Sequence, residues 1–127
     1  MMTDGTLIFD VGANDGTDTA YYLGLGHSVV AIEADPLLAD GLRVRFAAEM
    51  AGGQVTVVNT AVMDEDREEV TLYVGEDDTE SSLIRSMAER SGLVTGRVTV
   101  KGRSLCSLFG EYGLPWYCKI DIDILAI

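Results

Sequence analysis

The sequence is poor in cysteine, histidine and basic residues, and it has no long apolar run. Its two cysteines, Cys106 and Cys118, lie far apart without metal-ligand spacing, so we expect reduced, partly buried thiols and no metal site. The single histidine, His27, follows the first predicted helix, and that surface position argues against catalysis. No segment approaches the roughly 20 apolar residues of a membrane-spanning helix. The polar, acidic start before Leu7 gives no sign of a signal peptide. We therefore expect a cytoplasmic protein.

The balance of charge is strongly acidic. Nine Lys and Arg residues stand against 21 Asp and Glu residues, which gives a formal net charge of −12. Such a charge repels the phosphates of nucleic acids and anionic membrane surfaces. We therefore expect a small molecule or a protein segment as the partner, and neither nucleic acid nor membrane.

The length and composition predict one folded domain. The chain has 127 residues, of which 47% are hydrophobic, so it can bury a sizeable core. It contains no internal repeat, low-complexity tract or linker. We treat residues 1–127 as a single domain.

The first half of the chain alternates predicted strands and helices. Apolar runs predict strands at Leu7–Val11, Ser28–Glu33 and 55–62, with a helix at 17–25 that Gly26 ends. Strands that alternate with helices pair in parallel through right-handed crossovers. The pattern thus predicts an α/β fold with a parallel sheet.

A second helix is predicted between the second and third strands. Asp35 supplies an N-cap carboxylate and Pro36 occupies the first helical position. We expect the helix to continue until Gly52 and Gly53 end it. Its apolar face is made of residues at every fourth position, namely Leu38, Leu42, Phe46 and Met50.

The pattern changes in the second half. Alternating residues at 69–74 predict an exposed or edge strand, and 94–100 predicts a strand that pairs with it as an added hairpin. A short helix is predicted at 81–90, and residues 116–124 are predicted as a last core strand. One further short helix is indicated by an apolar face of Leu105, Leu108, Phe109 and Tyr112.

A glycine turn follows the first strand. That strand brings Asp10 to its end, Gly12 and Gly16 bracket a polar turn, and the second strand closes on Glu33. This order is typical of a nucleotide-like cofactor held at the carboxyl edge of a parallel sheet. The alternative is an ordinary strand–turn–helix whose glycines serve only the backbone geometry.

The glycine spacing bears on the kind of cofactor. Dinucleotide-binding turns follow Gly-x-Gly-x-x-Gly, whereas this turn follows Gly12-x-x-x-Gly16. Asp10 and Asp15 bring negative charge to it, which would repel a pyrophosphate. A cofactor with a cationic end and no phosphate fits better, and S-adenosylmethionine is such a molecule. Glu33 is placed to accept hydrogen bonds from ribose hydroxyls.

Five motifs, in order along nearly the whole chain, resemble those of FkbM-type methyltransferases. This resemblance implies a Rossmann-like methyltransferase fold, S-adenosylmethionine as cofactor, and methylation of hydroxyl oxygens on small molecules or sugars. The motifs are DVGANDG at 10–16, VAIEADP at 30–36, NTAV at 59–62, SSL at 81–83 and KIDI at 119–122.

The resemblance also assigns roles to individual residues. Glu33 would hold the ribose, and Asp121 would face the methyl group and the acceptor, where Asp121 or Asp123 would orient or deprotonate a hydroxyl. The remaining cofactor contacts fall at the methionine end and near the adenine. They are Asp10, Gly12, Asn14 and Gly16 for the former, and Asn59 and Ala61 for the latter.

The segment after KIDI departs from the family pattern. The family sheet has its strands in the order 3-2-1-4-5-7-6, so we expect this chain to finish at the fourth strand, with the C-terminal strands missing. That strand would then be an edge on which Ile120, Ile122 and Ile124 are poorly covered. Such an edge favours a homo-oligomer or marks a fragment of a longer protein, and we expect the truncation to impair turnover.

Two other functions remain open. A non-catalytic cofactor-binding or assembly module would pair with its partner through the exposed strand. A nucleotide-dependent oxidoreductase is disfavoured by the glycine spacing.

Overall fold

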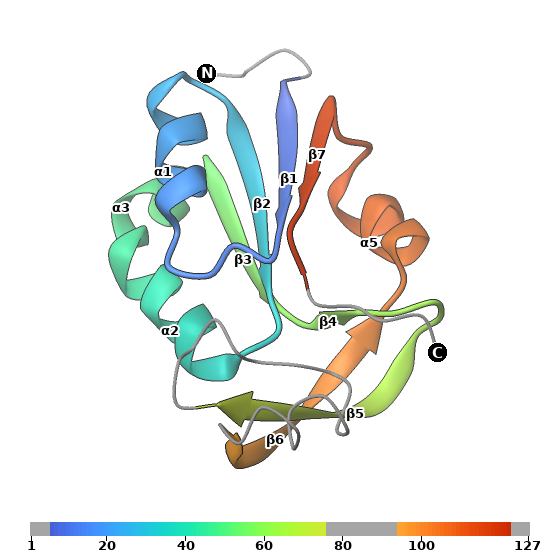
Figure 1. Cartoon of the computed structure of the whole chain (residues 1–127). Helices are drawn as coiled ribbons and strands as arrows, with labels where there is room; N and C mark the ends of the chain where they lie inside the picture. Colours follow the sequence, from blue (N-terminus) through green and yellow to red (C-terminus); the bar gives the residue numbers. More distant parts are fainter. Residues whose placement is uncertain (1–5, 76–93, 123–127) are drawn as a thin grey trace.

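The computed structural model describes residues 6–75 and 94–122 (Figure 1). Within these ranges the chain forms strands and helices in an α/β arrangement. In chain order they are β1 (Leu7–Val11), α1 (Thr17–Gly24), β2 (Ser28–Glu33), α2 (Pro36–Arg45), α3 (Ala47–Ala51), β3 (Val55–Asn59), β4 (Ala61–Val62), β5 (Arg67–Gly75), β6 (Val94–Arg103), α5 (Leu105–Tyr112) and β7 (Tyr117–Ile120).

A four-stranded parallel sheet forms the centre of the molecule, with the strand order β3-β2-β1-β7. Every pairing in it is parallel, as the alternation of strands and helices predicts. The glycine turn follows β1, and Glu33 ends the neighbouring strand β2. The sheet therefore brings the two motifs to the same edge.

Helices cover both faces of this sheet (Figure 1). On one face, α1, α2 and α3 bury Ile8 and Val29 together with Leu42 and Phe46. On the other face, Leu108 of α5 is fully buried, and Phe109 meets Phe9 edge to face at a centroid distance of 5.0 Å. The apolar strands thus have a core on each side, which explains why they read as continuous apolar runs.

The helix predicted after Asp35 begins as expected but is divided. The Asp35 side chain accepts a hydrogen bond from the amide of Leu37 at 3.0 Å, and Pro36 is the first helical residue. At Phe46 the backbone leaves the helical region (φ −108°, ψ 27°), so α2 and α3 replace one long helix. The Phe46 side chain is still buried, and Met50 packs against the same core.

The strand predicted at 55–62 is divided as well. β3 belongs to the parallel sheet, whereas β4 joins a second sheet with the order β4-β6-β5. The chain changes sheets at Thr60, whose hydroxyl donates to the carbonyl of Lys101 in β6 at 2.8 Å. The predicted pairing of the two later strands is confirmed, since β5 and β6 are antiparallel. In Figure 1 this sheet lies beyond the carboxyl ends of the parallel strands.

The strand predicted at 116–124 is present as β7 and lies at the edge of the parallel sheet, as the expected truncation implies; only its description as a core strand is wrong. Tyr117 and Ile120 are 48% and 53% exposed, because β7 pairs within the described residues with β1 only. The expected poor cover of Ile120 is confirmed, whereas Ile122 packs partly against the core. Ile124 and the helix predicted at 81–90 lie outside the described residues.

No helix within residues 6–75 and 94–122 is long and apolar enough to cross a membrane.

Candidate functional site

The glycine turn joins β1 to α1 in a strained backbone shape. Gly12, Asn14 and Gly16 all have positive φ angles, of 86°, 56° and 91°. The amides of Gly12 and Ala13 both donate to the carbonyl of Ile32, at 2.8 and 3.0 Å. The turn is therefore fastened to the end of β2, and only glycine or a small polar residue adopts its conformation readily.

Both glycines are also required by close neighbours within the chain itself. A Cβ on Gly12 would overlap the carbonyl oxygen of Asp121 and lie 2.7 Å from Cγ2 of Ile122. A Cβ on Gly16 would lie 2.7 Å from Cε2 of Phe46. Close packing against the backbone after β7 and against α2 therefore accounts for glycine at both positions. This agrees with the alternative of an ordinary strand–turn–helix whose glycines serve only the backbone geometry.

Glu33 is buried at the end of β2 and ties the turn to the next loop. Its Oε1 accepts from the amide of Asn14 at 2.8 Å, and its Oε2 accepts from the amide of Asp35 at 3.0 Å. Burial raises the pKa of Glu33, and these two hydrogen bonds oppose the rise. An ionised carboxylate accepts about four hydrogen bonds, so each oxygen keeps a lone pair for a further donor.

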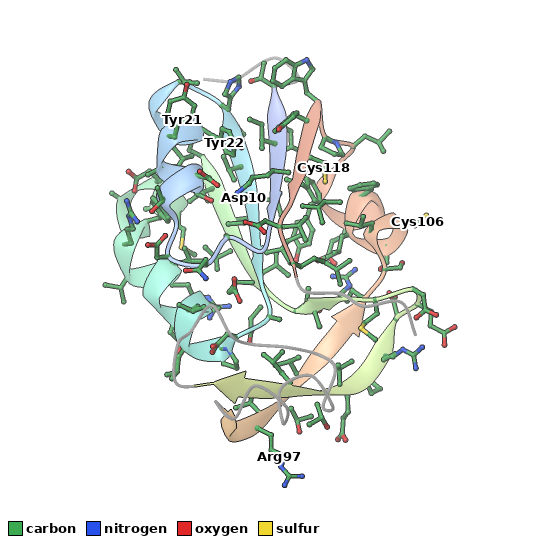
Figure 2. The ribbon with its side chains drawn as sticks, viewed as in Figure 1. Asp10, Tyr21, Tyr22, Arg97, Cys106 and Cys118 are labelled. Atoms are coloured by element: carbon green, nitrogen blue, oxygen red, sulfur yellow. The ribbon has the colours of Figure 1, made fainter. Side chains whose placement is uncertain are left out.

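Asp10 is fully buried near the end of β1 (Figure 2). Its Oδ2 accepts from the hydroxyl of Thr19 at 2.6 Å, while its Oδ1 makes no hydrogen bond with the described residues. Burial raises the pKa of Asp10; the Thr19 hydrogen bond and the charge of Lys119 lower it. A buried carboxylate oxygen without a donor is costly to folding, and such groups cluster at functional sites.

Asn59 and Ala61 lie at and just beyond the end of β3. The Asn59 amide donates to the carbonyls of Glu33 and Ala34, both at 2.9 Å, so it braces the loop after β2. Ala61 is buried in β4, where it pairs with Gly102 of the second sheet. The side chain of Asn59 therefore lies beside Glu33, and that of Ala61 lies in the core.

Asp121 follows β7 and is exposed, with 77% of its side chain accessible to solvent. Its amide donates to the carbonyl of Val11 at 2.9 Å, so its backbone lies against the glycine turn. Its Oδ2 is 3.7 Å from Nζ of Lys119. Asp123 lies outside the described residues.

Two residues of this edge escaped the sequence reasoning. Thr19 and Leu23 are the buried residues of α1. Their four-residue spacing places them on one helix face, so the sequence pattern could have predicted that Thr19 is buried. Lys119 pairs with Asp18 of α1, a contact between residues 101 positions apart that no local pattern reveals.

The edge carries far more acidic than basic groups. Arg45 donates to the carbonyl of Asp15 at 2.7 Å, and Lys119 faces Asp18. The hydroxyl and amide of Thr17 lower the pKa of Asp15 through hydrogen bonds. The acids at this edge are Asp10, Asp15, Asp18, Glu33, Asp35 and Asp121.

The histidine and the cysteines lie away from this edge. His27 precedes β2, hence at the opposite end of the strands, where it stacks on Trp116 at 5.5 Å. Both cysteines are free thiols; Cys118 is half-buried as expected, but Cys106 is exposed. Residues 6–75 and 94–122 contain no group of three or more His, Cys, Asp or Glu side chains arranged to hold a metal ion.

Comparisons with protein-family models, curated proteins and solved structures found no match to this chain. Any assignment of function therefore depends on the residues and their geometry.

Proposed function

We propose that this chain is an S-adenosylmethionine-dependent methyltransferase domain of FkbM type, with a Rossmann-like fold, that methylates a hydroxyl oxygen of a small molecule or sugar. One observation carries the proposal. The carboxylate of Glu33 lies 2.8 Å from the amide of Asn14, so the acid after β2 meets the glycine turn after β1. A carboxylate beside such a turn suits a ligand that combines a ribose with a second polar end.

The charge of this edge favours a sulfonium over a pyrophosphate. Asp10 is buried with one carboxylate oxygen that has no donor among the described residues, and Glu33 keeps lone pairs on both oxygens. These atoms fit the amine and ribose donors of S-adenosylmethionine. A dinucleotide would instead bring its phosphates against the same acids, at a cost in binding energy. The orphaned oxygen of Asp10 thus supports the sulfonium cofactor.

Methyl transfer requires little catalytic chemistry from the residues of this edge. S-adenosylmethionine, when bound, supplies an electrophilic methyl group. The chain's part is to hold that group in line with the acceptor oxygen. Asp121 is exposed beside the turn, where its carboxylate is available to orient the acceptor hydroxyl and accept its proton. The ammonium of Lys119 lies 3.7 Å from that carboxylate.

Calorimetric titration with S-adenosylmethionine and S-adenosylhomocysteine tests the cofactor assignment. We expect micromolar or weaker binding to the native chain, and a loss of at least tenfold in Asp10→Asn and in Glu33→Gln. The matched control is Asp40→Asn, which removes an exposed acid on α2 that pairs with Arg43 at 3.0 Å. The proposal fails if neither compound gives heat, and tight binding of NAD would revive the oxidoreductase.

A second candidate is an assembly module that uses the edge of β7. Tyr117 and Ile120 of this strand are 48% and 53% exposed, and Trp116 just before it is 65% exposed. Exposed apolar edges invite pairing. This candidate predicts an oligomer in sedimentation velocity and no methyl transfer to any acceptor. A monomer at all concentrations would contradict it.

A further inference from the structure

Lys119 occupies a central place among the acids of β1, α1 and the segment after β7. Its Cα is the register partner of Asp10 across the parallel pair β1–β7, so both side chains emerge on the same face of the sheet. Helix α1 covers that face and contributes Asp18, whose Oδ2 accepts a hydrogen bond from the Lys119 ammonium. The same ammonium is 3.7 Å from Oδ2 of Asp121.

The position of Asp121 depends on few contacts. β7 is an edge strand of four residues. Beyond it, the amide of Asp121 bonds to the carbonyl of Val11, and its own carbonyl lies on Gly12. On the side of α1, the ring of Tyr117 meets that of Tyr22 at 6.3 Å. The Lys119–Asp18 pair is therefore a main tie between the end of β7 and the helix that follows the glycine turn.

We infer that Lys119 is a positioning residue: its ammonium pairs with Asp18, lies 3.7 Å from Asp121 and shares a sheet face with its register partner Asp10, and it thereby fixes Asp121 against the glycine turn. The inference rests on the proposed function for the identity of the ligand. The linkage among the four side chains stands independently of it.

The charges around Asp10 determine the direction in which its pKa changes when Lys119 is replaced. Asp18 and Tyr22 face it from α1, Lys119 from β7, and Asp121 from the segment beyond, whereas Cys118 of β7 packs on the opposite face of the sheet. Its neighbour in β2 is Ala31, which carries no charge. Lys119 lowers the pKa of Asp10, whereas Asp18 and Asp121 raise it. Removing the ammonium therefore leaves Asp10 facing two acids, with no compensating cation beside it among the described residues.

Nuclear magnetic resonance titration of the Asp10 carboxyl tests the linkage in the native chain, Lys119→Met and Lys119→Arg. We expect Lys119→Met to raise the Asp10 pKa by roughly one unit or more, since an opposite charge nearby typically contributes about 1–3 units. Lys119→Arg restores most of the native value. The control Lys101→Met removes an exposed lysine of β6 and leaves the titration unchanged.

Hydrogen exchange at the amide of Asp121 tests the positioning. We expect faster exchange in Lys119→Met than in the native chain, and native exchange in Lys119→Arg and Lys101→Met. If Lys119→Met does not fold, Asp18→Asn provides the test instead. This variant removes a like charge near Asp10, so we expect the pKa of Asp10 to fall. An unchanged Asp10 titration in the folded variants, or unchanged exchange at Asp121, overturns the inference.

Titration calorimetry across pH then separates this inference from the proposed function. If S-adenosylmethionine binds through an ionised Asp10, the pH below which binding is lost is higher in Lys119→Met than in the native chain. If the Asp10 titration shifts as expected but no S-adenosylmethionine binds at any pH, the linkage stands and the proposed function fails.

Discussion

The two sides of the candidate site differ in how firmly they are held. On the side of β1 and β2, Asp10 and Glu33 are 0% and 8% exposed, and Glu33 is fixed by two backbone amides. On the side of β7, Asp121 has 77% of its side chain exposed and belongs to the edge of the sheet. The part that would hold a cofactor is thus built into the core, and the part that would meet an acceptor lies on the surface.

The difference follows from strand order. β1 and β2 each have neighbours on both sides, so groups at their ends are surrounded by backbone donors. β7 has a described neighbour on one side only. Groups at its end depend on side-chain pairs such as Lys119–Asp18, which solvent weakens.

The largest expected effect comes from removing the contact that joins the two sides. In Gly12→Ala, the added Cβ overlaps the carbonyl of Asp121, and alanine is strained at a φ of 86°. We expect a loss of about 3 kcal/mol in the free energy of unfolding, from backbone strain and overpacking together. Chemical denaturation measures it.

The control for this change is Gly41→Ala. Gly41 lies inside α2, and the described residues leave open space where its methyl group would lie. Alanine is therefore expected to stabilise the helix by about 0.5–1 kcal/mol. A Gly12→Ala variant as stable as the native chain would show that the end of β7 does not rest on the turn.

A smaller effect is expected from the charge of Asp10. Its pKa in the folded chain is raised above the ordinary 3.8, mainly by burial. The folded state then binds more protons than the unfolded state, so stability falls as the pH rises from about that value through the folded pKa. Asp10→Asn removes this dependence, and we expect the variant to lose less stability between acidic and neutral pH than the native chain.

Thermal unfolding across that pH range measures the difference, with Asp40→Asn as the exposed control. Equal pH dependence in the native chain and in Asp10→Asn would show that Asp10 is not a buried charge. Together with lost cofactor binding, the expected result would mark Asp10 as a residue kept for function at a cost in stability.

The smallest effects come from a matched pair of isoleucines. Ile32 of β2 is 1% exposed and Ile120 of β7 is 53% exposed. We expect Ile32→Val to lower the free energy of unfolding by about 0.5–1.5 kcal/mol, and Ile120→Val by less than about 0.5 kcal/mol. Equal losses in chemical denaturation would mean that the edge of β7 is covered in solution.

The sequence predicts the central strands well, because the pattern that marks them is contained within each segment. Leu7–Val11 and Ser28–Glu33 match β1 and β2 at both ends, since each is an apolar run bounded by glycine or polar residues. The start of α2 follows from Asp35 and Pro36 for the same reason. The division at Thr60 does not, because a hydrogen bond to the distant Lys101 accompanies it.

The candidate site divides in the same way. The order of strand, glycine turn and closing acid predicts that Glu33 lies near the turn, because parallel neighbours end at one edge. It does not predict that both carboxylate oxygens of Glu33 already accept hydrogen bonds from backbone amides of the chain itself. Nor does it predict that Asp121 lies on Gly12, since that contact depends on the docking of an edge strand.

The contact between the end of β7 and the glycine turn has a consequence for the order of folding. Lys119 and Asp18, which flank it, are 101 positions apart in the chain, and contacts of such separation form late because loop closure must precede them. During synthesis β1, α1 and β2 can dock before β7 exists. The backbone of Asp121 beside Gly12 is thus the last part of the site to form. A ligand that requires this contact would therefore bind only after β7 has docked.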